Sequence, residues 1–233
     1  LFRMRKAAEF AGFKEIIFVP EPLAAALEYR RHLTDEKNVL IGDFGGGTSD
    51  FTIMKMSGRT FQKSDVLGVD GCPYAGDALD SVFMSEKLNE HFGAKTKYRM
   101  SMSSNVLTMP PLVVDRLNKP AHIMHLKEKD TYHFIQEVRK CALNPQDVAA
   151  IDRLFTLIED QQIFSFFEKI EETKRQLSQN QNTIFNFDYT DLEITTEFNR
   201  NDFEQWSQTI KNKITDSLDR CLKQAQLNDQ QID

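Results

Sequence analysis

Hydrophobic residues in this chain recur with helical spacing in some stretches and form short continuous runs in others. Helical patterns cover about residues 2–11, 22–29, 77–91, 132–141, 145–158, 163–178, 199–206 and 209–226. Short apolar runs bounded by turn residues predict strands at about residues 16–19, 39–41, 51–56, 60–67, 184–187 and 192–196. Strands come first and helices dominate the middle and the end, which indicates an α/β core with an inserted α+β subdomain.

The pattern is weakest between about residues 94 and 129, a stretch rich in Ser, Asn and Met. Pro110 and Pro111 predict an interruption of any helix there, so we expect an irregular insertion. The long helix that follows later begins with Phe164, Phe166 and Phe167. We expect these three phenylalanines to pack in the core beneath the inserted subdomain.

The strongest chemical pattern is the run Asp43–Asp50, which reads D-F-G-G-G-T-S-D. An apolar strand ends at Asp43, turns on three glycines and resumes as a second apolar strand. Glycine has no Cβ, so the backbone N–H groups of such a turn can approach an anion closely, and a nucleotide phosphate is the expected anion. Asp43 is suited to act on a hydrated divalent cation, and the hydroxyls of Thr48 and Ser49 can hydrogen-bond phosphate oxygens. The helix-opening phosphate patterns G-x-x-x-x-G-K-[ST] and G-x-G-x-x-G are absent, so the phosphates would lie over a β-hairpin.

This run resembles the second phosphate motif of the superfamily that contains actin, sugar kinases and heat shock chaperone ATPases. The most similar family is that of the heat shock protein 70 (DnaK-type) chaperones. Three further stretches resemble motifs of that family in the same order: Val19–Ala26 its N-E-P-T-A-A-A segment, Tyr74–Asp80 its L-G-G-E-D-F-D segment, and Glu171–Ser178 its adenosine-contacting E-x-x-K-R-x-L-S helix. Residues from about 94 to 130 have no counterpart that we identify, and in this the chain is similar to the divergent bacterial YegD-type branch.

The resemblance implies an actin-like ATPase fold with a ribonuclease H-like core. Residues 1–37 would be a connecting segment from the first lobe, residues 38–70 and 190–233 the core of the second lobe, and residues 71–189 an inserted helical and β subdomain. Because Leu1 is not an initiator methionine and helical patterns reach both ends, we expect the chain to be part of a longer protein.

The resemblance also implies roles for single residues at a site for ATP or ADP with Mg²⁺. The catalytic residues would be Asp43, Glu21 and Thr48, with Asp43 and Glu21 also facing the metal through water and Thr48 bonding the terminal phosphate. By position alone, Glu21 reads instead as an acid that interacts with the dipole of the helix it precedes. The nucleotide-binding residues would be Gly45, Gly46, Gly47, Thr48, Gly76, Glu171, Lys174, Arg175 and Ser178.

Four of these residues are spaced to share one helix face: Glu171, Lys174, Arg175 and Ser178. Spacing alone is more typical of a solvated ion-pair face, whereas the resemblance implies contacts with adenine and ribose. Near Gly76, Ala75 replaces the first glycine of the family's pair, which restricts the backbone there.

Several parts of the family pattern have no counterpart in these 233 residues. They are the first phosphate motif, the lysine of the first lobe, the G-G-S-x-R-x-P motif and the peptide-binding domain. We therefore expect the parent protein to bind and hydrolyse ATP in a chaperone cycle with an unfolded client or co-chaperone, and this chain alone to bind nucleotide weakly with little or no turnover. The alternatives are a sugar-kinase-like or actin-like ATPase of the same fold, and a binding module with a vestigial nucleotide site.

Composition narrows the class of partner. The net charge of −6 argues against nucleic acid or an anionic membrane as the main partner, and no apolar run reaches the length of a membrane span. Three widely separated cysteines, Cys72, Cys141 and Cys221, are typical of reduced thiols in a cytoplasmic protein and form no metal-ligand cluster.

Overall fold

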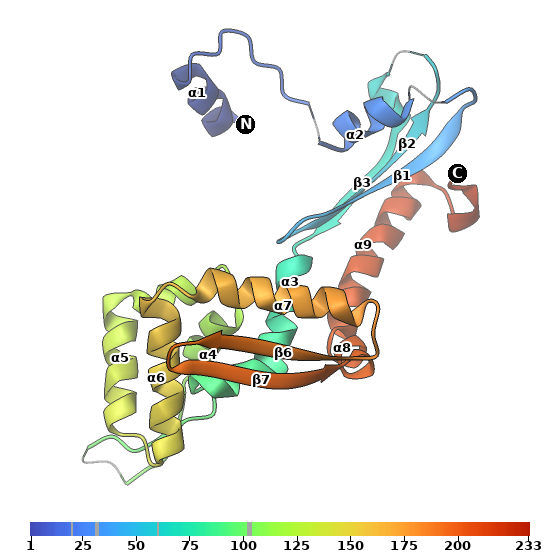
Figure 1. The fold of residues 1–233 in the computed structure, drawn as a ribbon. Helices are drawn as coiled ribbons and strands as arrows, with labels where there is room; N and C mark the ends of the chain where they lie inside the picture. Colours follow the sequence, from blue (N-terminus) through green and yellow to red (C-terminus); the bar gives the residue numbers. More distant parts are fainter. Residues whose placement is uncertain (20, 31–32, 60, 102–103) are drawn as a thin grey trace. The chain divides into compact units, whose positions relative to one another are not determined.

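The computed structural model describes residues 1–19, 21–30, 33–59, 61–101 and 104–233. The chain divides into two compact units, one of residues 1–73 with 214–233 and one of residues 74–213. Both units contain helices and strands (Figure 1), so the expected mixed α/β composition is confirmed. Among the described residues, no helix is both long and apolar enough to cross a membrane.

The first unit is built on an antiparallel sheet of three strands in the order β1-β2-β3. These strands are β1 (Lys37–Phe44), β2 (Ser49–Met56) and β3 (Val66–Cys72). Side chains alternate between the two faces of a strand, so Phe51 and Ile53 of β2 lie on one face and Asp50, Thr52 and Met54 on the other. The face with Phe51 and Ile53 is therefore mainly apolar, although it also carries Asp70 of β3, and the other face carries Asp50 at one end.

A helix packs on each face of this sheet (Figure 1). Phe51 and Ile53 form a cluster with Cys221 of α9 (Gln208–Ala225), and Met54 and Met56 form a cluster with Ala26 of α2 (Glu21–Arg30). Burial raises the pKa of the Cys221 thiol. The N-terminal helix α1 (Phe2–Phe10) has no buried residue.

Close contacts attach α9 and the C-terminal residues to the sheet. A Cβ on Gly68 of β3 would lie 2.5 Å from the carbonyl oxygen of Cys221, so only glycine lets the helix approach this closely. On the same strand, the Asp70 carboxylate accepts hydrogen bonds from the Ser217 hydroxyl at 2.5 Å and from the Arg220 guanidinium at 2.7 Å. Gly68 and Asp70 therefore fix the helix that covers the apolar face of the sheet.

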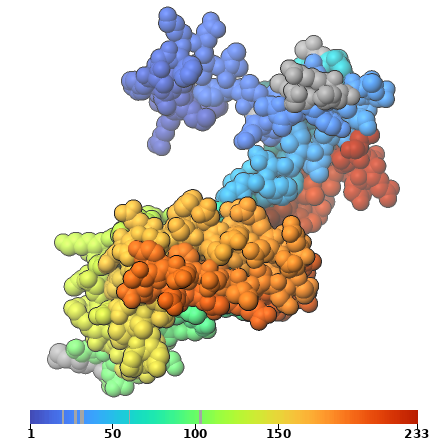
Figure 2. Space-filling view, in the orientation of Figure 1, coloured from blue at the N-terminus to red at the C-terminus, as the bar shows by residue number. Residues whose placement is uncertain are grey.

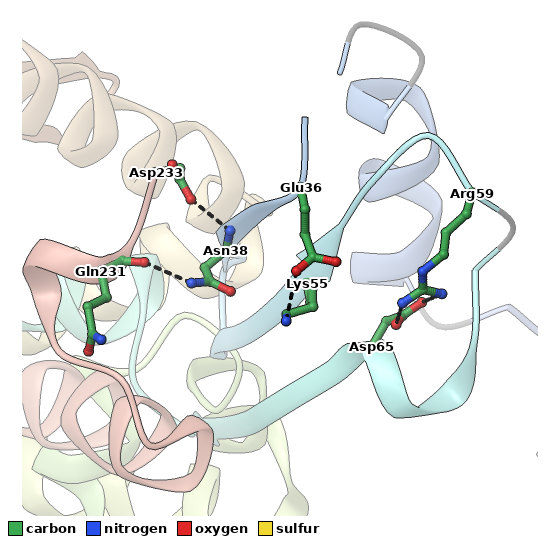
Figure 3. A network of polar contacts seen from close by, with 7 residues as sticks. All are labelled: Glu36, Asn38, Lys55, Arg59, Asp65, Gln231 and Asp233. Atoms are coloured by element: carbon green, nitrogen blue, oxygen red, sulfur yellow. Dashed lines mark hydrogen bonds and ion pairs between the residues drawn. The ribbon is translucent and has the colours of Figure 1, made fainter. Parts of the chain in front are cut away.

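The C-terminus is tied to β1. The backbone N–H of Asn38 donates to the Asp233 carboxylate at 2.8 Å, and the Asn38 side-chain amide donates to the carbonyl of Gln231 at 3.1 Å (Figure 3). The two bonds join residues 195 and 193 positions apart in the sequence, so the last residues of the chain stabilise the start of β1.

The second unit is mostly helical. Its helices are α3 (Gly76–Phe83), α4 (Pro111–Asn118), α5 (Lys129–Lys140), α6 (Pro145–Glu159), α7 (Ile163–Leu177), α8 (Arg200–Trp206) and the first residues of α9. Its strands are β4 (Lys97–Tyr98), β5 (Leu107–Thr108), β6 (Asn182–Tyr189) and β7 (Leu192–Asn199). The β6–β7 hairpin lies along α7 (Figure 1), and the two elements form a continuous surface in Figure 2. The core is rich in aromatic rings, with Phe166 in edge contact with Phe92, Phe185 and Phe187.

Most predicted elements are confirmed, but three expectations are wrong. Residues 16–19 form no strand, and Ile17 is 86% exposed. The third strand covers 66–72 instead of 60–67, because Lys63–Asp65 forms a 3₁₀ helix; Thr60 lies outside the described residues. Within the expected irregular insertion, Pro111 begins helix α4, because proline is well suited to the first helical position.

Two further expectations differ from the structure. Phe166 and Phe167 are buried as predicted, but Phe164 is 76% exposed. The chain returns from the second unit to the first at Lys213–Ile214, whereas the sequence suggested that this boundary lies at 189–190. A division at 189–190 would separate β6 from β7, which pair along their full length from Asn182–Asn199 to Tyr189–Leu192.

Candidate functional site

The glycine turn connects β1 to β2 and leaves backbone donors unused. The Gly45 N–H donates to the Thr48 carbonyl at 2.9 Å and closes the turn. Within the described part of the chain, no backbone hydrogen bond uses the N–H groups of Gly46 or Gly47. Two adjacent free N–H groups on an exposed turn can bind an anion.

Neither backbone conformation nor crowding within the chain explains Gly45 and Gly47 of this turn. Among the described glycines, only Gly12 and Gly93 have positive φ. A Cβ on Gly47 would meet nothing within 4 Å, and a Cβ on Gly45 would meet the Thr48 carbonyl oxygen at an ordinary 3.6 Å. A Cβ would instead fill open space beside the free N–H groups, so the geometry fits a phosphate that approaches the backbone.

The register of the hairpin places two carboxylates on the same face of the sheet. Asp43 at the end of β1 lies directly opposite Asp50 at the start of β2, so both side chains point to the same face. Glu21 is the first residue of α2, the helix that packs on this face. Glu21, Asp43 and Asp50 line one hollow of about 680 Å³ in the first unit. The fold thus brings together Glu21 and Asp43, the two residues predicted to face the metal; Pro20, which precedes Glu21, lies outside the described residues.

Hydrogen bonding and packing orient Asp50. The Thr48 hydroxyl donates to the Asp50 carboxylate at 2.8 Å. On the other side, a Cβ on Gly71 of β3 would lie only 2.3 Å from an Asp50 oxygen, so glycine at this position makes room for the carboxylate. Asp50 therefore links the glycine turn to the hollow.

The same hollow contains a lysine that motif reasoning missed. Lys63 lines it, and among the described residues its ammonium group has no hydrogen-bond or ion-pair partner. Lys63 begins a 3₁₀ helix whose last residue, Asp65, accepts hydrogen bonds from the Arg59 guanidinium (Figure 3). Asp65 also accepts one from the Gln62 N–H. The bond from Arg59 holds the pKa of the Asp65 carboxyl below its usual value. No sequence pattern marks Lys63, because its location depends on this local turn.

The carboxylates in the hollow suit a hydrated ion better than a chelated one. Within the described residues, no three His, Cys, Asp or Glu side chains converge closely enough to hold a metal by themselves. Mg²⁺ keeps several waters and commonly binds through one or two carboxylates together with phosphate oxygens. Glu21 and Asp43 fit that arrangement, as the residues that would hold the ion through water.

The second group of predicted residues lies on α3 and α7, in the second unit. Gly76 is the first residue of α3, after the buried Ala75. On α7, Arg175 lies 4.0 Å from Glu171, and the Ser178 hydroxyl donates to the Arg175 carbonyl at 2.6 Å. Glu171, Arg175 and Ser178 are exposed and free to meet a ligand.

Lys174 behaves differently from its three neighbours in the motif. Its ammonium group donates to the Asp80 carboxylate of α3 at 2.6 Å, and the two side chains are only 20% and 13% exposed. Burial raises the pKa of the Asp80 carboxyl, an effect that the bond from Lys174 opposes. The pair joins the two motifs of the second unit, with Lys174 directed at α3.

Comparisons with known proteins show which family this chain resembles. The family described as Hsp70 protein matches residues 3–112 and 155–233. The unmatched stretch is therefore 113–154, which covers α5, most of α6 and all of α4 except its first two residues, whereas we expected 94–130.

Individual relatives agree with the family match. The chain is 23% identical to the chaperone protein HscA of Buchnera aphidicola, over 62% of this chain and 39% of the relative. It is 31% identical to the mitochondrial heat shock 70 kDa protein of Dictyostelium discoideum, over 50% of this chain and 16% of the relative. It is 41% identical to the heat shock cognate HSP70 protein of Trypanosoma brucei brucei, over 36% of this chain and 13% of the relative.

The chain thus spans no more than 39% of the length of these relatives. The match does not favour the sugar-kinase or actin-like alternatives. Because the family pattern covers most of the sequence, including the glycine turn and the α7 motif, this chain belongs to the Hsp70 family of chaperones.

Proposed function

We propose that this chain is a nucleotide-binding part of an Hsp70-like chaperone that binds and hydrolyses ATP with Mg²⁺. The observation that carries the proposal is the common hollow lined by Glu21 and Asp43 beside a turn with free N–H groups. These two carboxylates lie in separate motifs, and a purely structural hairpin would not require them to meet. The proposal includes an actin-like core; membership of the YegD-type branch and a cytoplasmic location stay predictions.

The residues of the first unit would act on the phosphates. The N–H groups of Gly46 and Gly47 would donate to phosphate oxygens, and the Thr48 hydroxyl would bond the terminal phosphate. Asp43 would accept a hydrogen bond from the attacking water and orient it, while Glu21 would hold water of the metal's hydration shell. Bound Mg²⁺ would neutralise charge that develops on the phosphate oxygens. Such positioning and charge stabilisation account for most of the catalysis of phosphoryl transfer.

The residues of the second unit would act on the nucleoside. Glu171, Arg175 and Ser178 are exposed and offer an acceptor, a planar donor group and a hydroxyl, which suit the edges of adenine and ribose. Because Asp80 already binds the Lys174 ammonium, we assign Lys174 a positioning role that holds α7 against α3. Gly76, at the start of α3, would leave room for the ligand beside the backbone.

The whole protein would use this cycle on an unfolded client, alone or with a co-chaperone. This chain by itself is expected to bind nucleotide weakly and to turn over little ATP, since it spans at most 39% of the relatives.

Binding of ADP with and without Mg²⁺, measured by calorimetry on the wild type and on Asp43→Asn, tests the assignment. The wild type should bind more tightly with Mg²⁺, and the variant should lose that gain, about tenfold in affinity. Asp35→Asn, an exposed aspartate in the same unit outside the hollow, is the matched control and should behave as wild type. Equal magnesium dependence in wild type and Asp43→Asn would contradict the proposal.

A further inference from the structure

A second hollow lies on the second unit, and none of its lining residues is assigned to nucleotide. It has a volume of about 550 Å³ and is lined by Pro120, Met124, Lys127, Phe164 and Phe167, together with Gln161 before α7 and Ile163, the first residue of α7. One side comes from the 3₁₀ helix Ile123–Lys127 and the segment before it, and the other from the start of α7. The volume is in the range of ordinary binding sites.

The apolar side chains of this hollow are uncovered. Phe164 is 76% exposed and Met124 is 52% exposed, while Phe167 is 9% exposed and connects the hollow to the core of the unit. Large exposed apolar groups that lie together are typical of interaction sites. Methionine and aromatic residues are enriched at such surfaces because they supply large and adaptable contact areas.

The charge of the hollow is one-sided. Of the described residues that line it, Lys127 alone is charged, and none carries a carboxylate. Among the described residues, Lys127 has no ion-pair or hydrogen-bond partner, whereas two nearby cations are neutralised: Arg116 pairs with Glu128 at 3.1 Å and Lys119 with Asp115 at 2.7 Å. The complementary occupant therefore carries a negative charge next to a bulky apolar group.

The exposure of the walls indicates the size of the occupant. A small ligand is usually enclosed by its site, with most of its surface buried. Here Phe164 and Met124 face outward, so an occupant that covers them must extend across the rim, as a protein segment does. Pro120, Met124 and Lys127 also belong to the stretch 113–154 that the family pattern does not match, whereas Phe164 and Phe167 lie in the matched part.

We propose that this hollow is the docking surface for an acidic segment of a partner protein. The segment would insert a bulky apolar side chain between Met124 and Phe164 and bring an Asp or Glu carboxylate to the Lys127 ammonium. The surface is thus formed where an element outside the family pattern meets the family's own helix, so its partner is one that recognises this chain in particular.

Selection of peptides from a random phage-displayed library on the 233-residue chain tests the proposal. Enriched peptides should carry Phe, Trp or Leu flanked by Asp or Glu. A synthetic copy of an enriched peptide should bind Lys127→Glu and Phe164→Ser at least about tenfold more weakly than wild type. Replacing the acidic residues of the peptide by lysine should restore its binding to Lys127→Glu but not to wild type.

Matched controls come from the same unit. Lys211→Glu and Ile184→Ser change exposed residues that do not line the hollow and should leave peptide binding unchanged. Because Phe164 and Lys127 are exposed, their variants should give the circular dichroism spectrum and the unfolding midpoint of wild type. Absence of any enriched peptide, enrichment without the acidic and apolar pattern, or undiminished binding to the two variants would each overturn the proposal. Binding of decanoate at the hollow without peptide enrichment would also overturn it, in favour of a small carboxylate ligand.

Discussion

The Lys174 ammonium lies 2.6 Å from the Asp80 carboxylate, and with 20% and 13% exposure the two side chains form a largely buried ion pair. The two residues come from motifs far apart in the sequence, and their bond holds α7 against α3. Burying two charged groups costs desolvation energy, which their mutual attraction offsets. Removal of one partner leaves the other charge buried and uncompensated, whereas replacement of both partners by apolar groups is tolerated much better.

This relationship predicts a non-additive stability change. Lys174→Met should lower the free energy of unfolding by about 3 kcal/mol, because Asp80 remains buried without its partner. The double variant Lys174→Met with Asp80→Leu should recover most of that loss. Urea unfolding of the wild type, the two single variants Lys174→Met and Asp80→Leu, and the double variant forms a double-mutant cycle. Strictly additive losses in the free energy of unfolding would mean that the two side chains do not interact.

The contact between β3 and α9 predicts a large effect of one methyl group. Gly68→Ala places a Cβ 2.5 Å from the Cys221 carbonyl oxygen, a backbone atom that cannot move without shifting the helix. We expect a loss of about 2 kcal/mol in the free energy of unfolding. Gly58→Ala is the matched control, since a Cβ there meets nothing within 4 Å. Equal unfolding midpoints for the two variants would show that α9 does not approach the sheet in this way.

A substitution in the glycine turn is expected to weaken ligand binding while leaving the stability of the fold unchanged. A Cβ on Gly47 meets no protein atom within 4 Å, so Gly47→Ala should change the free energy of unfolding by less than about 0.5 kcal/mol. If the turn contacts phosphate, the same methyl group should weaken binding of ADP with Mg²⁺ by about tenfold. Thermal unfolding and calorimetry on the same protein samples measure both quantities. Unchanged ADP affinity in Gly47→Ala would leave the glycine without a ligand role.

The bond between Asp70 and Arg220 predicts a dependence on pH. The Arg220 guanidinium, helped by the Ser217 hydroxyl, holds the pKa of the Asp70 carboxyl below its usual value. In the unfolded chain that carboxyl titrates at about pH 4. A carboxyl whose pKa is lower in the folded state contributes stability above its unfolded pKa and loses that contribution as the pH falls through its folded pKa.

Asp70→Asn should therefore be less stable than wild type at pH 7, by about 1 to 2 kcal/mol, and the difference should shrink below about pH 4. Comparing Asp70→Asn with the wild type at each pH separates the contribution of Asp70 from that of other acids whose pKa is also lowered. Urea unfolding of both proteins at several pH values measures the difference in the free energy of unfolding. A stability difference that stayed constant from neutral to acid pH would contradict the assignment of the shift to this ion pair.

Local sequence predicts the hairpin and its register well. Two apolar runs around three glycines can pair in few ways, and alternation along the strands then puts Asp43 and Asp50 on the same face. The meeting of Glu21 with Asp43 required the family resemblance, because no periodicity fixes how α2 lies on the sheet. Lys63 could not be predicted, since the 3₁₀ helix that carries it depends on the contact between Arg59 and Asp65.

The long helix shows both the use and the limit of hydrophobic pattern. Its buried residues Phe166, Ile170 and Leu177 follow helical spacing, and Phe164 lies off that stripe. The expectation that Phe164 is buried came from its residue type, and periodicity would have corrected it. Likewise, the spacing of Lys174 with Arg175 and Ser178 gives no sign of Asp80, because an ion partner on another helix is a property of the tertiary structure.

The measurement that tests the central claim most directly is an amide NMR titration of this chain with Mg²⁺ and ADP, with Mg²⁺ alone as the control. It detects weak binding and reports on each residue. The account predicts saturable shifts at the amides of Gly46, Gly47 and Thr48, accompanied by shifts at Arg175 and Ser178. No shift at the glycine turn with millimolar nucleotide, or shifts equal to those with Mg²⁺ alone, would contradict it.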